Sequence, residues 1–310
     1  MTRRRLVGIG ALALGLVATS LAAYVLLGRD TPLPTDASGS LFFISDRAGQ
    51  DALYVRHLPR SEPRRLVVTG EPVRDPAPSP DGSRVAFVMG GRIGIVLLPR
   101  GEIRFVTLGV DHQDAEPSWR PDGRALVVSS RVRGRDAADL VLLDLDTPDG
   151  KPARTLLTDT RGLDETSPRF SPDGRYVVFV REDGVFRIAL DDGRAHRLTS
   201  GFRKFRKPRF LPSGRLLVLW SEGKVYGVDT MDIDGKNRET LSQGTVFYRS
   251  VAPSPDGRYL AATFTFDLAF RPQDAFRKRE EVHLLDAQGR FLAVVERSSR
   301  HASHSPEWGR

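Results

Sequence analysis

The sequence of 310 residues contains no cysteine. This absence excludes disulfides, thiol catalysis, thiolate metal sites and lipidation of a mature N-terminal cysteine. Six histidines are present, but none stands in an HExxH or comparable metal-ligand spacing. The segment 219–223 is the nearest approach to a nucleophile elbow, and it lacks the leading glycine and falls in an expected strand-to-strand turn. We therefore expect no cofactor, no metal and no catalytic residue, and the sequence favours binding over catalysis.

The first thirty residues differ sharply in composition from the rest of the chain. Arg3, Arg4 and Arg5 precede an uncharged, largely apolar run over residues 6–28. As a helix this run is about 34 Å long, which is enough to cross a hydrocarbon layer of roughly 30 Å. The excess of arginine before the run favours a cytoplasmic N-terminus and translocation of everything that follows. Residues 1–28 are therefore predicted to form one N-terminal transmembrane helix that anchors the chain.

A cleaved signal peptide is the alternative interpretation of the same segment. Residues 20–22, Ser-Leu-Ala, resemble the small-residue end of a cleavage site. The apolar run continues beyond them, past the roughly 7 to 15 residues usual for a signal peptide, which favours the retained anchor. Both interpretations place the remainder outside the cytoplasm, either periplasmic or at the cell surface. Residues 29–40 then form a linker, and 41–310 are enough for one large all-β domain.

The chain is basic, with a formal net charge of +8. A basic protein can bind nucleic acid, but an exported one first meets anionic lipid headgroups and wall polymers. We therefore expect no nucleic-acid partner. The membrane is expected as a partner through the N-terminal helix.

One phrase that ends in a Pro-Asp-Gly turn recurs along the chain. It occupies residues 75–82, 116–123 and 167–174, and less regular copies occupy 207–214 and 250–257. The spacing of about 40 to 50 residues is that of a four-stranded propeller blade. Proline presets the first corner of the turn, and glycine supplies the left-handed position that leads into the next strand.

Each phrase is followed by strand-like runs, the first rich in β-branched and aromatic residues, such as 176–180. The N-terminal unit, from Leu41, shows only the last three strands of such a blade. Residues 305–309 match the beginning of the phrase and start a blade that is not finished. We therefore predict an all-β, six-bladed β-propeller over 41–310, closed by pairing the C-terminal strand near Trp308 with the N-terminal blade near Phe43.

The repeats resemble the WD40-like (PD40) repeats of the TolB propeller family. The resemblance rests on the recurring phrase, on the turn Ser45-Asp46-Arg47-Ala48-Gly49 and on the Tyr54-Val55 strand ending, and it covers roughly residues 40–310. It implies a propeller, but it does not imply one activity, because the family includes partner-binding scaffolds, propellers of serine peptidases and a few lyases.

One face of the predicted ring carries the loops that connect one blade to the next, and we call it the connection face. Two of its loops are acidic and the following one is basic, and the longest insertion, 267–281, is expected to project from the same face. The residues predicted to bind a partner at this mouth of the channel are Asp114, Glu116, Arg206, Lys207, Arg249, Phe270 and Arg271.

The favoured hypothesis is a membrane-anchored, extracytoplasmic scaffold in the cell envelope that binds a protein or peptide as a monomeric propeller. The alternative is a glycan-acting enzyme, a lyase or hydrolase, with its site at the same mouth. The sequence supports binding more strongly because the face carries charges of both signs while no catalytic pattern is found.

Overall fold

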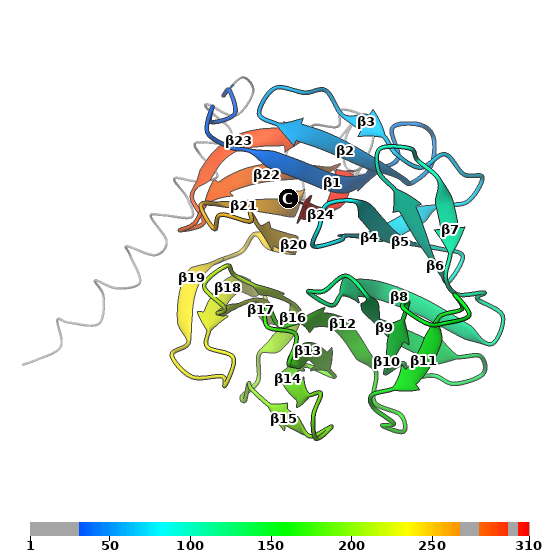
Figure 1. Ribbon diagram of the computed structural model, residues 1–310. Helices are drawn as coiled ribbons and strands as arrows, with labels where there is room; N and C mark the ends of the chain where they lie inside the picture. The colour runs from blue at the N-terminus through cyan, green and yellow to red at the C-terminus, as the bar shows by residue number, and fades with distance from the viewer. Residues whose placement is uncertain (1–30, 267–278, 297–302, 310) are drawn as a thin grey trace, which may run out of the picture.

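The structure is a computed structural model that describes residues 31–266, 279–296 and 303–309. This part of the chain forms strands β1 to β24 and contains no helix. The strands make six four-stranded antiparallel sheets arranged as blades around a central axis (Figure 1). The all-β, six-bladed propeller predicted from the repeats is confirmed.

Blades 1 to 3 have the following strands. Blade 1 consists of β24 (Ser303–Gly309), β1 (Gly39–Ser45), β2 (Ala52–Leu58) and β3 (Arg64–Arg65). Blade 2 consists of β4 (Val73–Pro78), β5 (Arg84–Met89), β6 (Arg92–Leu97) and β7 (Ile103–Phe105). Blade 3 consists of β8 (His112–Trp119), β9 (Ala125–Val132), β10 (Asp139–Asp144) and β11 (Ala153–Leu156).

Blades 4 to 6 repeat this order. Blade 4 consists of β12 (Glu165–Phe170), β13 (Tyr176–Arg181), β14 (Gly184–Ala189) and β15 (Ala195–Arg197). Blade 5 consists of β16 (Lys204–Phe210), β17 (Leu216–Glu222), β18 (Val225–Met231) and β19 (Glu239–Gly244). Blade 6 consists of β20 (Phe247–Pro253), β21 (Tyr259–Phe266), β22 (Arg279–Asp286) and β23 (Phe291–Glu296).

The second strand of each blade is buried on both faces. In β17, Leu216, Leu217, Val218 and Leu219 are each 0% exposed. Successive strand residues point to opposite faces of a sheet, so four consecutive buried residues require a neighbour on both sides. The blades on either side supply that cover, which explains why these runs are continuously hydrophobic instead of alternating.

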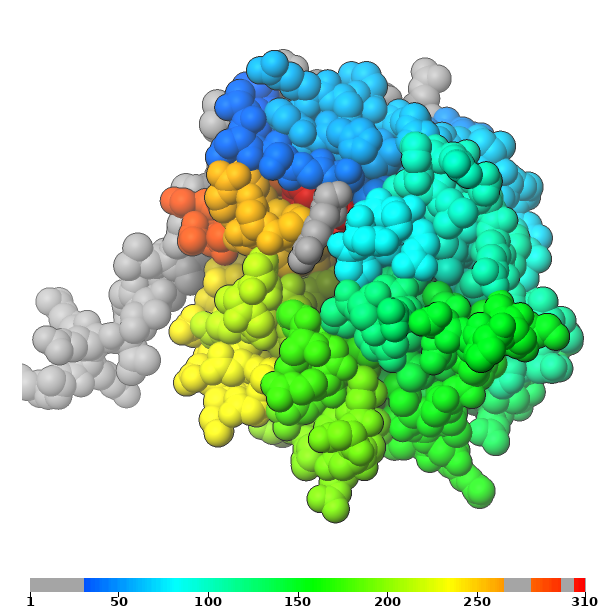
Figure 2. Space-filling view, in the orientation of Figure 1, coloured from blue at the N-terminus to red at the C-terminus, as the bar shows by residue number. Residues whose placement is uncertain are grey.

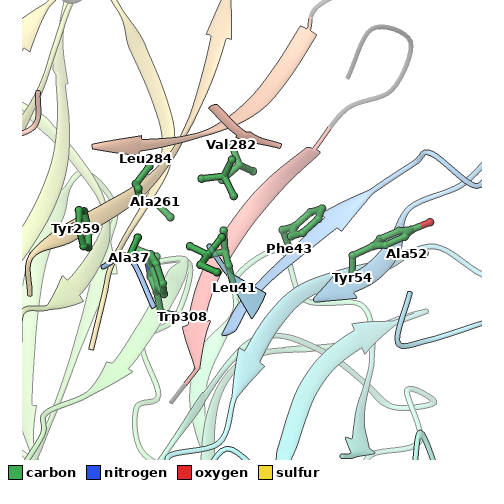
Figure 3. Packing of buried hydrophobic residues seen from close by; sticks show 13 residues of the cluster. Ala37, Leu41, Phe43, Ala52, Tyr54, Tyr259, Ala261, Val282, Leu284 and Trp308 are labelled. Atoms are coloured by element: carbon green, nitrogen blue, oxygen red, sulfur yellow. The ribbon is translucent and has the colours of Figure 1, made fainter. Parts of the chain in front are cut away.

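Strand β24 comes from the end of the chain and pairs antiparallel with β1. In this pairing Trp308 lies opposite Leu41, and Gly309 lies opposite Ser40. The interface between blades 6 and 1 is filled by one apolar cluster. Leu41 and Phe43 of β1 and Trp308 of β24 pack in it with Ala261 and other residues of blade 6 (Figure 3). Five further clusters fill the other five blade interfaces, so the packing is continuous around the ring.

The direction of the strands defines the two ends of the ring. The first strand of each blade starts at the connection face and ends at the Pro-Asp-Gly turns, and we call that second end the turn face. Because β1 runs antiparallel to β24, it starts at the turn face, and the preceding residues 31–38 lie there too. There, Asp36 accepts hydrogen bonds from Arg258 (2.7 Å) and from the hydroxyl of Tyr259 (2.7 Å).

The predicted anchor over residues 6–28 lies outside the described residues. Within the described ranges, no helix has the length and hydrophobicity needed to cross a membrane.

Candidate functional site

The first strands surround the central axis (Figure 1), and those of blades 1 to 5 share one local distortion. Five residues at the start of the phrase have a left-handed backbone with φ between 49° and 55°: Asp75, Glu116, Ser167, Lys207 and Ser305. The pairing register shifts at these positions, as in a β-bulge. A bulge bends the strand and redirects the neighbouring side chains. The repeated phrase therefore sets which side chains face the channel.

On the connection side of the channel, Glu116 and Lys207 form an ion pair between blades 3 and 5. The same carboxylate accepts hydrogen bonds from the backbone N–H (2.6 Å) and hydroxyl (3.0 Å) of Ser167 in blade 4. Burial alone raises the pKa of the Glu116 carboxyl, but the charge and hydrogen bond of Lys207 and the bond from Ser167 outweigh it and hold the pKa at about 2. Glu116 is therefore ionised at neutral pH.

On the turn side, a second ion cluster crosses the channel. Oε1 of Glu307 in blade 1 accepts hydrogen bonds from Arg169 (3.1 Å) of blade 4, which lies opposite in the ring, and from Arg209 (2.6 Å) of blade 5. Burial lowers the pKa of the Arg209 guanidinium, with the charge of Arg169 acting in the same direction, to about 10. The Arg209 guanidinium therefore remains charged at neutral pH. With two arginines and one glutamate, the cluster carries one formal net positive charge.

The cluster lies at a cavity of about 500 Å³ that opens among the Pro-Asp-Gly turns, and we call this cavity the bowl. Arg169 and Glu307 line it together with the rings of Trp119 and Trp308. Its wall includes the second proline of all five phrases, namely Pro80, Pro121, Pro172, Pro212 and Pro255. The space-filling view shows the blades arranged in a ring around the middle of the molecule (Figure 2).

The structure brings Glu116 and Lys207 of the predicted partner-binding set into direct contact. Asp114, in contrast, is 0% exposed and makes a bidentate ion pair with Arg154, both distances 3.0 Å. A carboxylate that is fully buried and paired has no surface to offer a partner, so Asp114 acts by holding β11 to the start of β8.

Arg206 and Arg249 lie near the start of the first strands of blades 5 and 6. The guanidinium of Arg206 packs over the ring of Phe247, 4.2 Å from its centroid, and burial lowers the pKa of this group. Arg249 forms an ion pair with Glu280 and keeps a side-chain exposure of 51%. Of these two, Arg249 is the one that presents charge to solvent. Phe270 and Arg271 lie outside the described residues.

The acidic loop between β11 and β12 is paired with neighbouring arginines. Asp164 accepts a hydrogen bond from Arg131 (3.1 Å), and Arg135 lies 3.9 Å from Asp159. Arg131 lies near the end of β9 and Arg135 lies in the segment that joins β9 to β10, so both bring opposite charge to this loop.

The connection face also exposes apolar side chains. Phe202 is 97% exposed, Leu108 81%, Val68 74% and Val110 59%. All four lie in segments that lead from the last strand of one blade into the first strand of the next. Phe205, by contrast, lies in β16, is buried at 3% and packs between blades 4 and 5. The sequence does not separate the exposed Phe202 from the buried Phe205, because the two stand three positions apart in one basic stretch.

Comparisons of the sequence and of the structure with known proteins indicate the same family. A family model described as the TolB beta propeller domain matches residues 100–310. A TolB homologue from Chlorobium luteolum is 30% identical over 46% of this chain. That alignment covers 31% of the homologue, so the chain spans about a third of the length of this curated relative.

Two solved structures are similar in fold. TolB from Acinetobacter baumannii superposes with a TM-score of 0.72 at 19% identity, covering 96% of this chain and 72% of that one. An oligogalacturonate lyase from Vibrio parahaemolyticus superposes with a TM-score of 0.60 at 13% identity, covering 87% of this chain and 77% of that one. At these identities the likeness concerns the fold alone.

Proposed function

Because the chain belongs to the TolB β-propeller family, we propose that it is an extracytoplasmic scaffold of the cell envelope that binds a protein or peptide at its connection face. Residues 6–28 tether it to the membrane in this proposal. The observation that carries the binding role is the exposure of large apolar side chains on that face, above all Phe202 at 97% and Leu108 at 81%. Exposed aromatic and aliphatic side chains beside charged pairs are typical of a surface that a partner covers.

The position of the linker supports the choice of face. Residues 31–38 lie at the turn face, where the carboxylate of Asp36 is bound by Arg258 and Tyr259. A tether that ends at residue 28 leaves only seven residues, 29–35, before the attachment at Asp36. The turn face is then held close to the membrane, and the connection face points away from it toward envelope partners.

Charged residues at the mouth add to the surface in different ways. Arg249 is half-exposed and presents its charge at the connection face, whereas Lys207 is paired with Glu116 inside the channel. A rim charge such as that of Arg249 mainly accelerates association and makes it depend on salt, while buried apolar contacts supply affinity.

The experiment compares partner capture by the full chain with capture by the double variant Phe202→Ser/Leu108→Ser. Both proteins are used as affinity baits on detergent-solubilised membranes of the source organism, and co-purified proteins are quantified by mass spectrometry. We expect at least about a tenfold loss of the specific partner in the double variant, because truncation of interface anchors commonly costs 1 kcal/mol or more each.

Ile103→Ser is the matched control. Ile103 is 37% exposed at the start of β7, the fourth strand of blade 2, which begins at the turn-face end, so this variant removes apolar surface away from the connection face. Its capture profile is expected to equal that of the unmodified chain. Equal capture by the double variant and this control would reject the connection face as the binding surface.

The glycan-acting alternative is supported by likeness of fold to an oligogalacturonate lyase. Likeness of fold alone does not indicate a shared reaction. Among the described residues, no group of three or more histidine, aspartate or glutamate side chains is placed to hold a metal ion. The channel carboxylates Glu116 and Glu307 are both engaged by cationic side chains. A binding scaffold therefore agrees better with the geometry.

A further inference from the structure

The bowl at the turn face has an apolar wall above a cationic floor. The wall is built from proline rings and from Trp119 and Trp308, and the charged groups that line it are Arg169 and Glu307. The charge of Arg209 lies directly behind, because its Nη2 meets the same Glu307 oxygen as Arg169 does. One carboxylate thus faces two guanidiniums.

Three of the four serine hydroxyls in the wall are not available to a ligand, and the fourth, that of Ser118, accepts a hydrogen bond from the backbone N–H of Phe170 (3.3 Å). The hydroxyl of Ser79 donates to Asp81 (2.5 Å) and accepts from the backbone N–H of Arg84 (2.9 Å). Ser171 and Ser254 are bound in the same way within their own turns. These three hydroxyls have donor and acceptor partners already, so the wall behaves as an apolar surface and offers little to a polyhydroxylated sugar.

The floor, in contrast, has donors without partners. Each guanidinium carries about five N–H donors. On each of Arg169 and Arg209, partners among the described residues engage Nη1, through the preceding proline carbonyl, and Nη2, through Glu307. Nε of Arg209 and Nε1 of Trp308 are buried and have no hydrogen-bond partner within the described ranges. Buried donors of this kind favour a ligand with acceptor oxygens.

Acidic groups around the rim do not cancel this preference. The turn carboxylates of Asp81, Asp173 and Asp256 fold back onto the serines of their own turns. Asp173 and Asp256 also pair with Arg175 and Arg258 at 2.7 Å. None of these three aspartates lines the bowl, whose floor carries one formal net positive charge.

We propose that the bowl binds the free C-terminal carboxylate of a polypeptide whose last residue is apolar, with Arg169 receiving the carboxylate and Trp119 and Trp308 contacting the apolar side chain. The volume of about 500 Å³ accommodates a terminal residue or two, not a folded domain. This site lies at the opposite end of the channel from the connection face and does not depend on the function proposed above.

The test uses the purified full chain in detergent and reads intrinsic tryptophan fluorescence. Trp119 and Trp308 line the bowl, whereas Trp220 is 1% exposed in the core between blades 4 and 5 and supplies a constant background. The probe is the peptide acetyl-Ala-Ala-Leu with a free C-terminal carboxylate, titrated beside the same peptide with a C-terminal amide and beside trigalacturonate. We expect saturable binding of the acid, and binding at least about tenfold weaker for the amide.

Two variants make the proposal specific. Arg169→Gln is expected to weaken binding of the peptide acid about tenfold, because it removes the receiving charge. Glu307→Gln is expected to strengthen it several-fold, because it removes the competing carboxylate while keeping its shape. A purely structural role of the Arg169–Glu307 pair predicts the same direction of change in both variants.

Arg175→Gln is the matched control, because it removes a rim arginine that is 74% exposed at a neighbouring turn. Circular dichroism melting of every variant checks that the propeller remains folded. Equal binding of acid and amide, preferential binding of trigalacturonate, or weakening by Glu307→Gln in a folded protein would each overturn the proposal.

Discussion

The carboxylate of Glu116 on β8 and the ammonium of Lys207 on β16 form an ion pair although a whole blade separates their strands. Ser167 of the intervening blade donates two hydrogen bonds to the same carboxylate. Three neighbouring blades are therefore joined through one side chain inside the channel. The side-chain exposures of Glu116 and Lys207 are 15% and 31%, so water screens the pair only in part.

Removal of the Lys207 charge is expected to destabilise the propeller. Lys207→Met leaves the Glu116 carboxylate largely buried without its cation, which costs about 2 kcal/mol or more of the free energy of unfolding. Urea denaturation at pH 7 measures this cost. Lys204→Met is the control, because Lys204 is 69% exposed and its pair with Asp183 contributes at most about 0.5 kcal/mol. Equal stability of the two variants would contradict the role of the pair.

The low pKa of Glu116 makes this contribution depend on pH. The folded carboxyl keeps its charge down to a pKa of about 2, whereas the ordinary value is 4.5. The stabilisation is therefore complete above pH 4.5 and is lost as the pH falls from 4.5 toward 2. At pH 3 the destabilisation by Glu116→Gln is expected to be about 2 kcal/mol smaller than at pH 7. A destabilisation that is equal at both pH values would show that the Glu116 pKa is not depressed.

Trp308 is expected to be one of the main stabilising residues of the interface between blades 6 and 1. It is 9% exposed, lies opposite Leu41 and packs in the cluster shared by those blades. Trp308→Ala removes a large buried side chain and is expected to lower the free energy of unfolding by about 3 kcal/mol. Phe202→Ala, on a side chain that is 97% exposed, is the control and leaves the melting temperature unchanged. A similar melting temperature for both variants would show that β24 contributes little to the ring.

The repeats made the fold predictable, but the site was predictable only in part. A phrase that recurs with blade spacing reports turns and strands directly, since both depend on residues close in sequence. The pairing of Glu116 with Lys207, or of Asp114 with Arg154, depends on which side chains the bulges turn toward each other across blades. The third position of the phrase varies among copies and holds Arg169 and Glu307. These charged residues are visible in the sequence, but only the ring geometry shows that they meet in the channel.

Gly227 is required for the packing of Trp220 in blade 5. The two residues are cross-strand partners of β18 and β17, and a Cβ at position 227 would overlap the indole ring. Trp220 is 1% exposed and cannot move aside without disturbing the core. Gly227→Ala is expected to lower the free energy of unfolding by about 1 to 3 kcal/mol, measured by thermal or urea denaturation. Gly70→Ala is the control, because no heavy atom lies within 4 Å of its Cβ position, and an equal effect of both would refute the steric argument.

Asp36 holds the linker against the turn face, and its substitution is expected to release the linker without unfolding the ring. Its carboxylate receives hydrogen bonds from Arg258 and Tyr259 and raises the pKa of the Tyr259 phenol through the hydrogen bond. Asp36→Asn removes the charge that Arg258 binds, so proteolytic cleavage within residues 31–38 is expected to become at least several-fold faster while the melting temperature stays the same. Ultraviolet titration of the tyrosines is expected to show one phenol whose pKa is lower than in the unmodified chain.

Asp234→Asn provides the control for this last variant. Asp234 is also an exposed carboxylate, but its partner Lys236 lies in the same turn of blade 5, whereas the linker is bound by blade 6. Its loss is expected to leave both the cleavage rate and the tyrosine titration unchanged. If Asp36→Asn is cleaved no faster than Asp234→Asn, the linker is held by other contacts. The proposed orientation of the propeller relative to the membrane would then lose its structural support.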